Sequence, residues 1–202
     1  MKRVVLVHGI FRQSRVFRKL ASRLKKLGYH VTAPDLYHQF GALSLTEVAE
    51  QLQTHIETHF DDGEPFDLVG LSMGGIVSRY YLQRLGGLDR LRRFVAIASP
   101  HFGTWTAYGF PRTTALDMRP GSPLLEDLNR DVELLDRATT VSIWTPWDFI
   151  IVPARSCCLP VGKTVRVNVF PHGMMAWHER SVEAIVGVLS EGEVEPAKFT
   201  ES

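Results

Sequence analysis

The chain has 202 residues and a formal net charge of +1, with 45% hydrophobic and 22% charged residues. That length and composition suit a single globular domain, residues 1–202, and the balanced charge gives no reason to expect nucleic acid or an acidic membrane as a partner. No apolar run approaches the roughly 18 residues of a membrane span, and the run that follows Met1-Lys2-Arg3 is too short for a signal peptide.

Short apolar runs alternate with amphipathic helical patterns along the chain. The runs that predict strands are 4–7, 30–33, 68–69, 94–98, 141–144 and 165–169. Helices are expected between them, around residues 17–27, 46–56, 74–85 and 177–189, where apolar residues recur at helical spacing. Because the strands are short, apolar throughout and separated by helices, we expect an α/β fold. Its parallel sheet would be doubly wound, with helices on both faces.

Residues 101–137 interrupt this alternation. The segment contains no clear strand, is punctuated by glycine and proline, and is long for a connection. We expect it to pass over the carboxyl edge of the sheet, with a helical part near residues 123–135. The polar tail 191–202 is expected to be frayed. Cys157 and Cys158 are adjacent and unsuited to a long-range disulfide, which favours a reducing, cytoplasmic compartment.

The most informative motif is Gly70-Leu71-Ser72-Met73-Gly74. An apolar run ends at Gly70 and a helical pattern begins directly after Ser72, so this G-x-S-x-G lies between a strand and a helix, as a nucleophile elbow requires. The glycines leave room for a sharp turn that holds the serine in a strained conformation and lifts its hydroxyl clear of the sheet. We therefore predict that Ser72 is a nucleophile.

A serine nucleophile needs a base within hydrogen-bonding distance. His178 lies in the loop between the predicted last strand and the final helix, and we predict that it is this base. His172 lies in the same loop and is the alternative. Both positions follow a strand at the carboxyl edge of the sheet, where catalytic groups of such folds are found.

The base in turn needs a carboxylate that orients it. Asp148 follows the predicted strand 141–144 by a short loop and precedes Phe149-Ile150-Ile151, an apolar setting in which an isolated carboxylate would be costly. We predict that Asp148 is the acid, with Asp117 as the alternative. The resulting order Ser72, Asp148, His178 is the one expected for this architecture.

Two backbone N–H groups are expected to stabilise the oxyanion. One belongs to Met73, directly after the nucleophile, and the other to Ile10, because Gly9 allows a sharp turn after the first strand. The N–H of Phe11 is the alternative if that turn is one residue longer. The side chain of His8 is expected to be structural, bonded to loop backbone.

These motifs together resemble the α/β-hydrolase superfamily, and within it the small bacterial lipases and esterases. The matching stretches are Val5 to Phe11, Gly70 to Gly75, Ala98 to Thr104 and Trp147 to Pro153, together with the late His178. The resemblance implies a minimal α/β-hydrolase fold of about six mostly parallel strands, with 101–137 as a small cap-like excursion. It also implies hydrolysis of carboxylic esters through an acyl-enzyme, without cofactor or metal. The chain departs from the family in having Ala-Trp before this histidine, where relatives often have glycine, and in lacking a large lid.

Aromatic side chains near the predicted site suggest the substrate. The residues expected to bind an apolar acyl group of a small-molecule or lipid ester are Phe11, Phe102, Trp105 and Trp177. The alternative for the residues of the excursion is that they anchor that loop to the core. An acyltransferase or a thioesterase would use the same machinery, and a non-catalytic binding protein on the same fold is the third interpretation. We expect a monomer, with peripheral membrane contact through the aromatic excursion as a further hypothesis.

Overall fold

The computed structural model describes residues 2–10 and 12–190. Within them the chain forms six β-strands: β1 (Lys2–Val7), β2 (Tyr29–Thr32), β3 (Phe66–Leu71), β4 (Leu91–Ile97), β5 (Thr139–Trp144) and β6 (Lys163–Arg166). The α-helices of the same residues are α1 (Arg18–Lys26), α2 (Leu45–His59), α3 (Met73–Arg84), α4 (Thr113–Asp117), α5 (Pro123–Arg130) and α6 (Glu179–Ser190). The predicted tail 191–202 lies outside the described residues.

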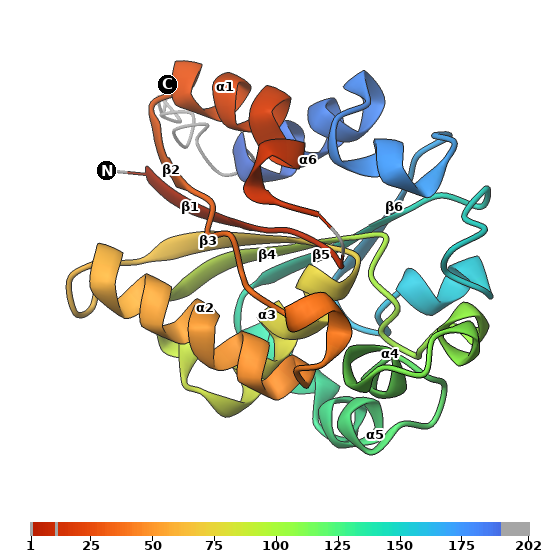
Figure 1. Ribbon diagram of the computed structural model, residues 1–202. Helices are drawn as coiled ribbons and strands as arrows, with labels where there is room; N and C mark the ends of the chain where they lie inside the picture. The colour runs from red at the N-terminus through yellow and green to blue at the C-terminus, as the bar shows by residue number, and fades with distance from the viewer. Residues whose placement is uncertain (1, 11, 191–202) are drawn as a thin grey trace, which may run out of the picture.

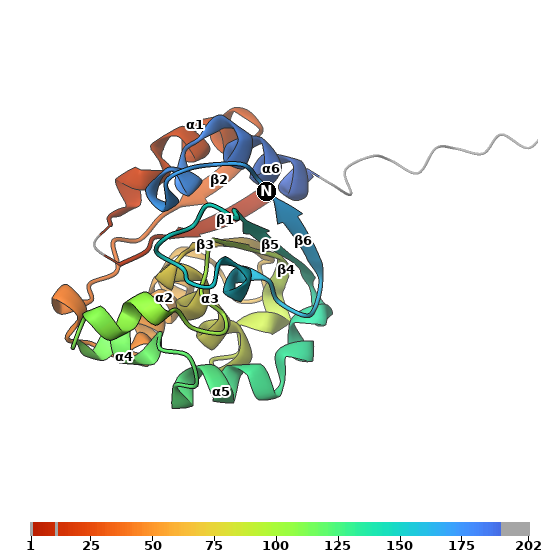
Figure 2. The same cartoon turned by 90° about the vertical axis from the view of Figure 1, so that its right-hand side faces the viewer.

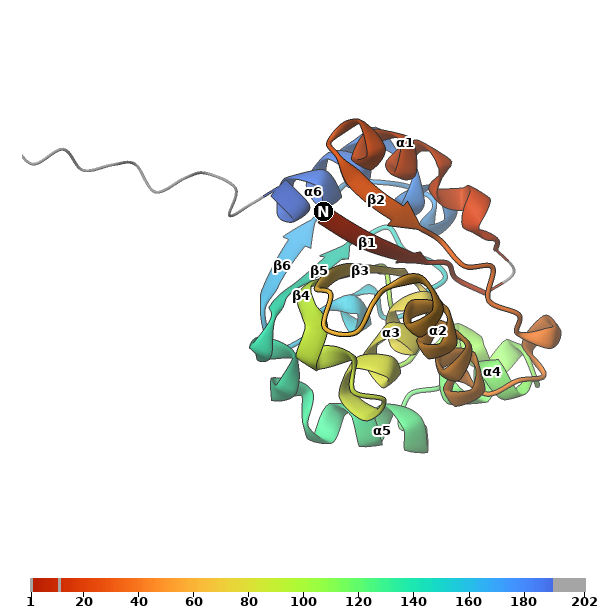
Figure 3. The ribbon, with the colours of Figure 1, turned by 90° about the vertical axis from the view of Figure 1, so that its left-hand side faces the viewer.

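The strands form one parallel sheet in the order β2-β1-β3-β4-β5-β6. In Figure 3 this order can be followed from β2 at one edge to β6 at the other. The chain steps from β1 to β2 in one direction and then crosses to β3 on the other side of β1. The carboxyl ends of β1 and β3 therefore meet at a topological switch point, where ligands bind in open α/β sheets. The α/β fold with parallel strands is confirmed.

Helices cover both faces of the sheet, with α1 and α6 on one side and α2 and α3 on the other (Figure 1). Each face has its own apolar core, which includes Leu20 and Leu24 of α1 on one side and Leu52 and Ile56 of α2 on the other. These residues are fully buried. Burial on both faces explains why the strands are apolar throughout rather than alternating.

The last strand is shorter than its apolar run suggests. The predicted strand 165–169 corresponds to β6 at Lys163–Arg166, so the prediction was shifted toward the carboxyl end. Val167 and Val169 are nevertheless buried in the core of the α1 and α6 face. Their apolar character therefore reflects side-chain burial after the chain has left the ladder, and sequence alone does not separate these two causes.

The excursion predicted at 101–137 contains α4, α5 and two short 3₁₀ helices, Trp105–Gly109 and Val132–Arg137. It lies on the α2 and α3 side of the sheet (Figure 2). Arg79 of α3 is fully buried and donates hydrogen bonds to the carbonyl oxygen of Leu128 (2.6 Å) and to Oδ1 of Asn129 (3.0 Å). Arg84 adds hydrogen-bonded ion pairs to Asp127 and Asp131. The excursion is thus fastened to the central helix by buried and half-buried polar contacts.

Candidate active site

Ser72 occupies the sharp turn between β3 and α3. Its backbone has φ 54° and ψ −123°, a conformation that is strained for any residue with a side chain. The turn is possible because its neighbours lack side chains: a Cβ on Gly70 would lie 2.6 Å from Cα of Gly75, and one on Gly74 would lie 2.3 Å from the carbonyl oxygen of Val7. The glycines of the motif are therefore required by close packing, as the sequence predicted.

The loop after β1 lies directly against this turn. A Cβ on Gly9 would lie 3.1 Å from Cβ of Ser72. The loop expected to contribute an oxyanion-hole N–H therefore lies next to the predicted nucleophile at the switch point. Met73 is the first residue of α3, and its N–H has no acceptor within the helix. Ile10 lies in the turn after β1. His8 is buried, and its Nε2 accepts a hydrogen bond from the N–H of Leu36 (2.9 Å), which confirms its structural role.

Asp148 and His172 are joined by a hydrogen bond at the carboxyl edge of the sheet. Oδ2 of Asp148 accepts a hydrogen bond from Nδ1 of His172 at 2.7 Å, and the carboxylate is fully buried. Its other oxygen, Oδ1, accepts from the N–H groups of Ile150 (3.0 Å) and Ile151 (2.8 Å), which fixes the orientation of the side chain. Because Nδ1 holds the proton in this bond, Nε2 of a neutral His172 carries the lone pair that a general base needs.

The structure does not bring His178 to Asp148. His178 immediately precedes α6, and its Nδ1 accepts a hydrogen bond from the N–H of Arg180 at 3.2 Å. The ring therefore caps the helix, and the assignment of His178 as partner of the acid must be replaced by the alternative, His172. The signal for His172 was its position, three residues after buried Val169 at the end of the apolar run, whereas His178 is already at the start of the helix.

Asp117, the alternative acid, lies elsewhere. Its Oδ2 accepts a hydrogen bond from the N–H of Leu45 at 2.7 Å, so it satisfies the first turn of α2. Burial raises the pKa of this carboxyl, and the N–H of Leu45 and the charge of Glu47 act on it less strongly. It is therefore a structural carboxylate.

The Ser72 hydroxyl makes no hydrogen bond to any residue in the described part of the chain, and the side chain is 7% exposed. Catalytic hydrogen bonds are often long without substrate and shorten in the complex. Ser72 is thus a buried residue at the switch point whose hydroxyl has no hydrogen-bond partner among the described residues, while Asp148 and His172 already share a hydrogen bond.

The aromatic residues expected to contact substrate are exposed. Phe102, Trp105 and Trp177 have 43%, 59% and 44% of their surface accessible, so they do not anchor their loops by burial. The N–H of Trp105 donates to the carbonyl oxygen of Val152 (2.9 Å), which fastens the excursion to the loop that carries Asp148. Phe11, the fourth such residue, lies outside the described residues.

Comparison with known proteins agrees with this fold. The model of the alpha/beta hydrolase family matches residues 4–197. No curated protein sequence matches the chain significantly. The lipase of Bacillus licheniformis in its mature form superposes with a TM-score of 0.76 at 14% identity, covering 93% of this chain and 91% of the lipase.

Two further solved structures share the fold. The bromoperoxidase of Bacillus anthracis has a TM-score of 0.72 at 19% identity, covering 94% of this chain and 92% of that protein. A thermophilic esterase from Thermogutta terrifontis has a TM-score of 0.66 at 17% identity, covering 94% and 89%. At such identities the likeness concerns the fold alone. Among the described residues, no helix has the length and apolar character that crossing a bilayer requires.

Proposed function

Because the chain belongs to the alpha/beta hydrolase family, we propose that it hydrolyses carboxylic esters with Ser72 as nucleophile, His172 as general base and Asp148 as the acid that orients it. The observation that carries the proposal is the 2.7 Å contact between Oδ2 of Asp148 and Nδ1 of His172 at the same sheet edge as the strained Ser72. Gln39, Phe40 and Ala98 also have positive φ, but the strain at Ser72 coincides with the glycine elbow, and backbone strain is concentrated at functional sites.

The proposed reaction has two halves. Oγ of Ser72 attacks the ester carbonyl while its proton passes to Nε2 of His172, and the N–H groups of Met73 and Ile10 stabilise the oxyanion. The tetrahedral intermediate then collapses: the bond to the leaving alcohol breaks, and the alcohol takes the proton from His172. Water, deprotonated by the same nitrogen, attacks the acyl-serine, and the acid departs as Ser72 regains its proton. Asp148 stays ionised throughout.

The exposed aromatic residues support an apolar acyl group. Trp105 stacks on Tyr108 with ring centroids 5.5 Å apart, and Phe102 is also open to solvent in the same excursion. Flat apolar surfaces beside a nucleophile suit an acyl chain. Peripheral contact with a membrane through these residues is part of the same proposal, as are a monomeric state and a cytoplasmic location.

The testing experiment is hydrolysis of p-nitrophenyl esters from acetyl to palmitoyl by the wild type and by Ser72→Ala, with Ser190→Ala at the end of α6 as a matched control. We expect Ser72→Ala to abolish turnover and Ser190→Ala to leave it unchanged. A fluorophosphonate should add its mass to the wild type and not to Ser72→Ala. Turnover that persists in Ser72→Ala, with the same chain-length preference, would refute the assignment.

A further inference from the structure

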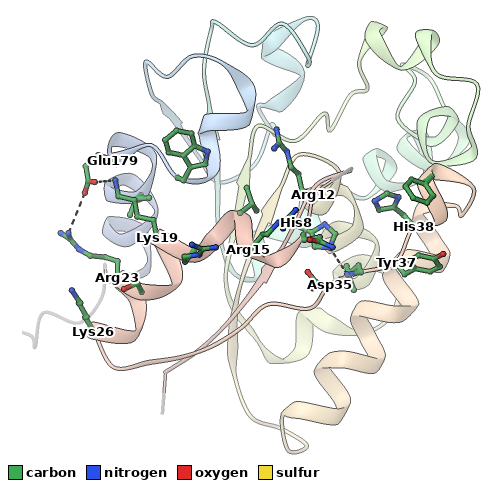
Figure 4. A pocket seen from close by; sticks show the side chains of 18 of the residues that line it. His8, Arg12, Arg15, Lys19, Arg23, Lys26, Asp35, Tyr37, His38 and Glu179 are labelled. Atoms are coloured by element: carbon green, nitrogen blue, oxygen red, sulfur yellow. Dashed lines mark hydrogen bonds and ion pairs between the residues drawn. The ribbon is translucent and has the colours of Figure 1, made fainter.

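A groove of about 1170 Å³ runs along the first helix, beside the proposed active site. Its walls come from three segments: the first turn and exposed face of α1 with the residues before it, the connection 35–40 after β2, and residues 177–182 at the start of α6. Figure 4 shows His8 and Arg12 near the middle of the groove, Tyr37 and His38 toward one end, and Glu179 at the other. Ser72, Asp148 and His172 do not line the groove, and among the described residues Trp177 is the one lining residue that the sequence predicted to contact substrate.

The groove is strongly cationic. Six cationic side chains line it against the two carboxylates of Asp35 and Glu179, whereas the whole chain has a net charge of only +1. The six are Arg12, Arg15, Arg18, Lys19, Arg23 and Lys26. Lys19, Arg23 and Lys26 recur at helical spacing on one face of α1, a stretch of about 10 Å at 1.5 Å per residue. These three cations therefore form a row along the face of α1 that lines the groove.

The carboxylates neutralise only part of this charge. Glu179 is shared by Lys19 and Arg23, whose Nη1 lies 4.0 Å from it. Asp35 accepts a hydrogen bond from the N–H of Ser14, and this bond, more than the nearby charge of Arg15, lowers the pKa of its carboxyl. Arg12, Arg18 and Lys26 form no ion pair within the described residues.

Arg12 connects the groove to the proposed active site. Its N–H donates to the carbonyl oxygen of Gly9 (3.2 Å), in the loop that contacts Ser72. Its guanidinium reaches the loop of the general base: a Cβ on Gly173 would lie only 2.7 Å from Nη2 of Arg12. The glycine that follows His172 thus makes room for Arg12, which lies near the middle of the groove and reaches the loop of His172.

We propose that this groove binds the leaving part of the substrate, and that this part is a phosphorylated alcohol or thiol. The proposal rests on the proposed function. His172 must protonate the leaving group in the proposed reaction, so a groove that reaches the loop of His172 through Arg12 lies on the leaving-group side of the scissile bond. The apolar acyl group would occupy the opposite side, against the aromatic excursion.

Phosphate fits the groove better than a single carboxylate or a flat bilayer. Four of the six cations are arginines, whose planar guanidinium binds phosphate oxygens in pairs. Their distribution along the helix suits two or more phosphates. Exposed aromatic side chains, those of Tyr37, Phe40 and Trp177, do line the groove, but a flat bilayer would contact only the rim of a concave surface and would leave its arginines unpaired.

The first test measures binding of inorganic tripolyphosphate by calorimetry. The variant is Arg15→Gln/Lys26→Gln, and the matched control is Lys25→Gln, which alters an exposed lysine on the same helix that does not line the groove. We expect the double variant to weaken binding about tenfold, because two cations of the groove lose their charge. Binding by the wild type should also weaken as ionic strength rises.

The second test compares two thioesters that share the acyl group and the reacting bond. Butyryl-coenzyme A carries phosphates on its leaving part, and S-butyryl-N-acetylcysteamine carries none. We expect kcat/KM to favour the coenzyme A ester at least tenfold in the wild type. That ratio should fall about tenfold in Arg15→Gln/Lys26→Gln and stay constant in Lys25→Gln. Because the ratio is taken within each protein, partial unfolding cancels.

Several outcomes would overturn the proposal. An unchanged ratio in the double variant would do so, as would equal loss of tripolyphosphate binding in the double variant and the control. Binding to phosphatidylglycerol vesicles without binding of tripolyphosphate would assign the groove to a membrane surface instead. If tripolyphosphate bound in the groove while no ester or thioester was turned over, the phosphate site would stand and the proposed hydrolysis would fail.

Discussion

If His172 rather than His178 is the general base, as we propose, two single variants should behave in opposite ways. His172→Ala removes the only imidazole that contacts Asp148 among the described residues, and loss of a positioned general base costs about 10⁴-fold in kcat, or about 5.5 kcal/mol of activation free energy. His178→Ala removes a helix cap, the bond from the N–H of Arg180 at 3.2 Å. Such a cap contributes about 0.5–1 kcal/mol, so we expect a Tm lower by about 1–4 °C and turnover within twofold of the wild type.

The assay is hydrolysis of p-nitrophenyl butyrate together with thermal unfolding followed by circular dichroism. Asp148→Asn should lose about as much activity as His172→Ala, and the double variant little more, because residues that act as a unit are not additive. If His178→Ala lost more than a hundredfold in kcat at an unchanged Tm while His172→Ala stayed active, the base would be His178, and the hydrogen bond between His172 and Asp148 would be structural.

Three other features give testable expectations. Gly74→Ala places a Cβ 2.3 Å from the carbonyl oxygen of Val7 and should destabilise the fold by about 3 kcal/mol. Gly187→Ala, at an exposed position of α6 where a Cβ meets nothing within 4 Å, should stabilise the fold by about 1 kcal/mol. Calorimetry measures both changes, and similar Tm values for the two variants would contradict the packing argument. Burial, with a smaller effect of the charge of His59, lowers the pKa of His55 to about 4 from 6.5. The folded state then binds fewer protons than the unfolded state, so the free energy of unfolding should fall as pH drops from about 6.5 to about 4. His55→Gln should flatten that slope in urea titrations, and an equal slope would exclude His55 as the cause. Trp105→Ala/Phe110→Ala should reduce turnover of palmitoyl esters more than that of acetyl esters and lower co-sedimentation with liposomes; unaltered chain-length preference and co-sedimentation would remove the apolar role of the excursion.

The fold was accessible from the sequence because its signals are local. Apolar runs and helical spacing predicted the six strands and most helices, and the strand bounds changed by a few residues. The elbow at Ser72 was predictable for the same reason, since the strand, the turn glycines and the helix are contiguous. The shift of β6 shows the limit of this approach: burial of Val167 and Val169 gives the same pattern as pairing.

The rest of the site depends on contacts between distant segments. His172 and His178 occupy one loop, and only the position of Asp148, which is 24 residues away from His172, distinguishes them. The cationic groove could not be predicted from the sequence for a related reason. In the sequence, the arginines before and within α1 look like the charged residues of any solvent-exposed helix face. They face a groove only because the residues after β2 and the start of α6 are folded against that helix.

The attachment of the excursion to α3 has a kinetic consequence. A segment whose backbone carbonyl is held by a fully buried arginine, and whose acidic side chains are paired with a second arginine, does not swing away at low energetic cost. We therefore expect this part of the excursion to be preformed, so that a substrate of the proposed hydrolase would enter beside it rather than beneath a moving flap. In the proposed reaction the rate of turnover would then not depend on loop opening. The chemical steps or product release would limit the rate, and we expect no increase in activity when the substrate aggregates.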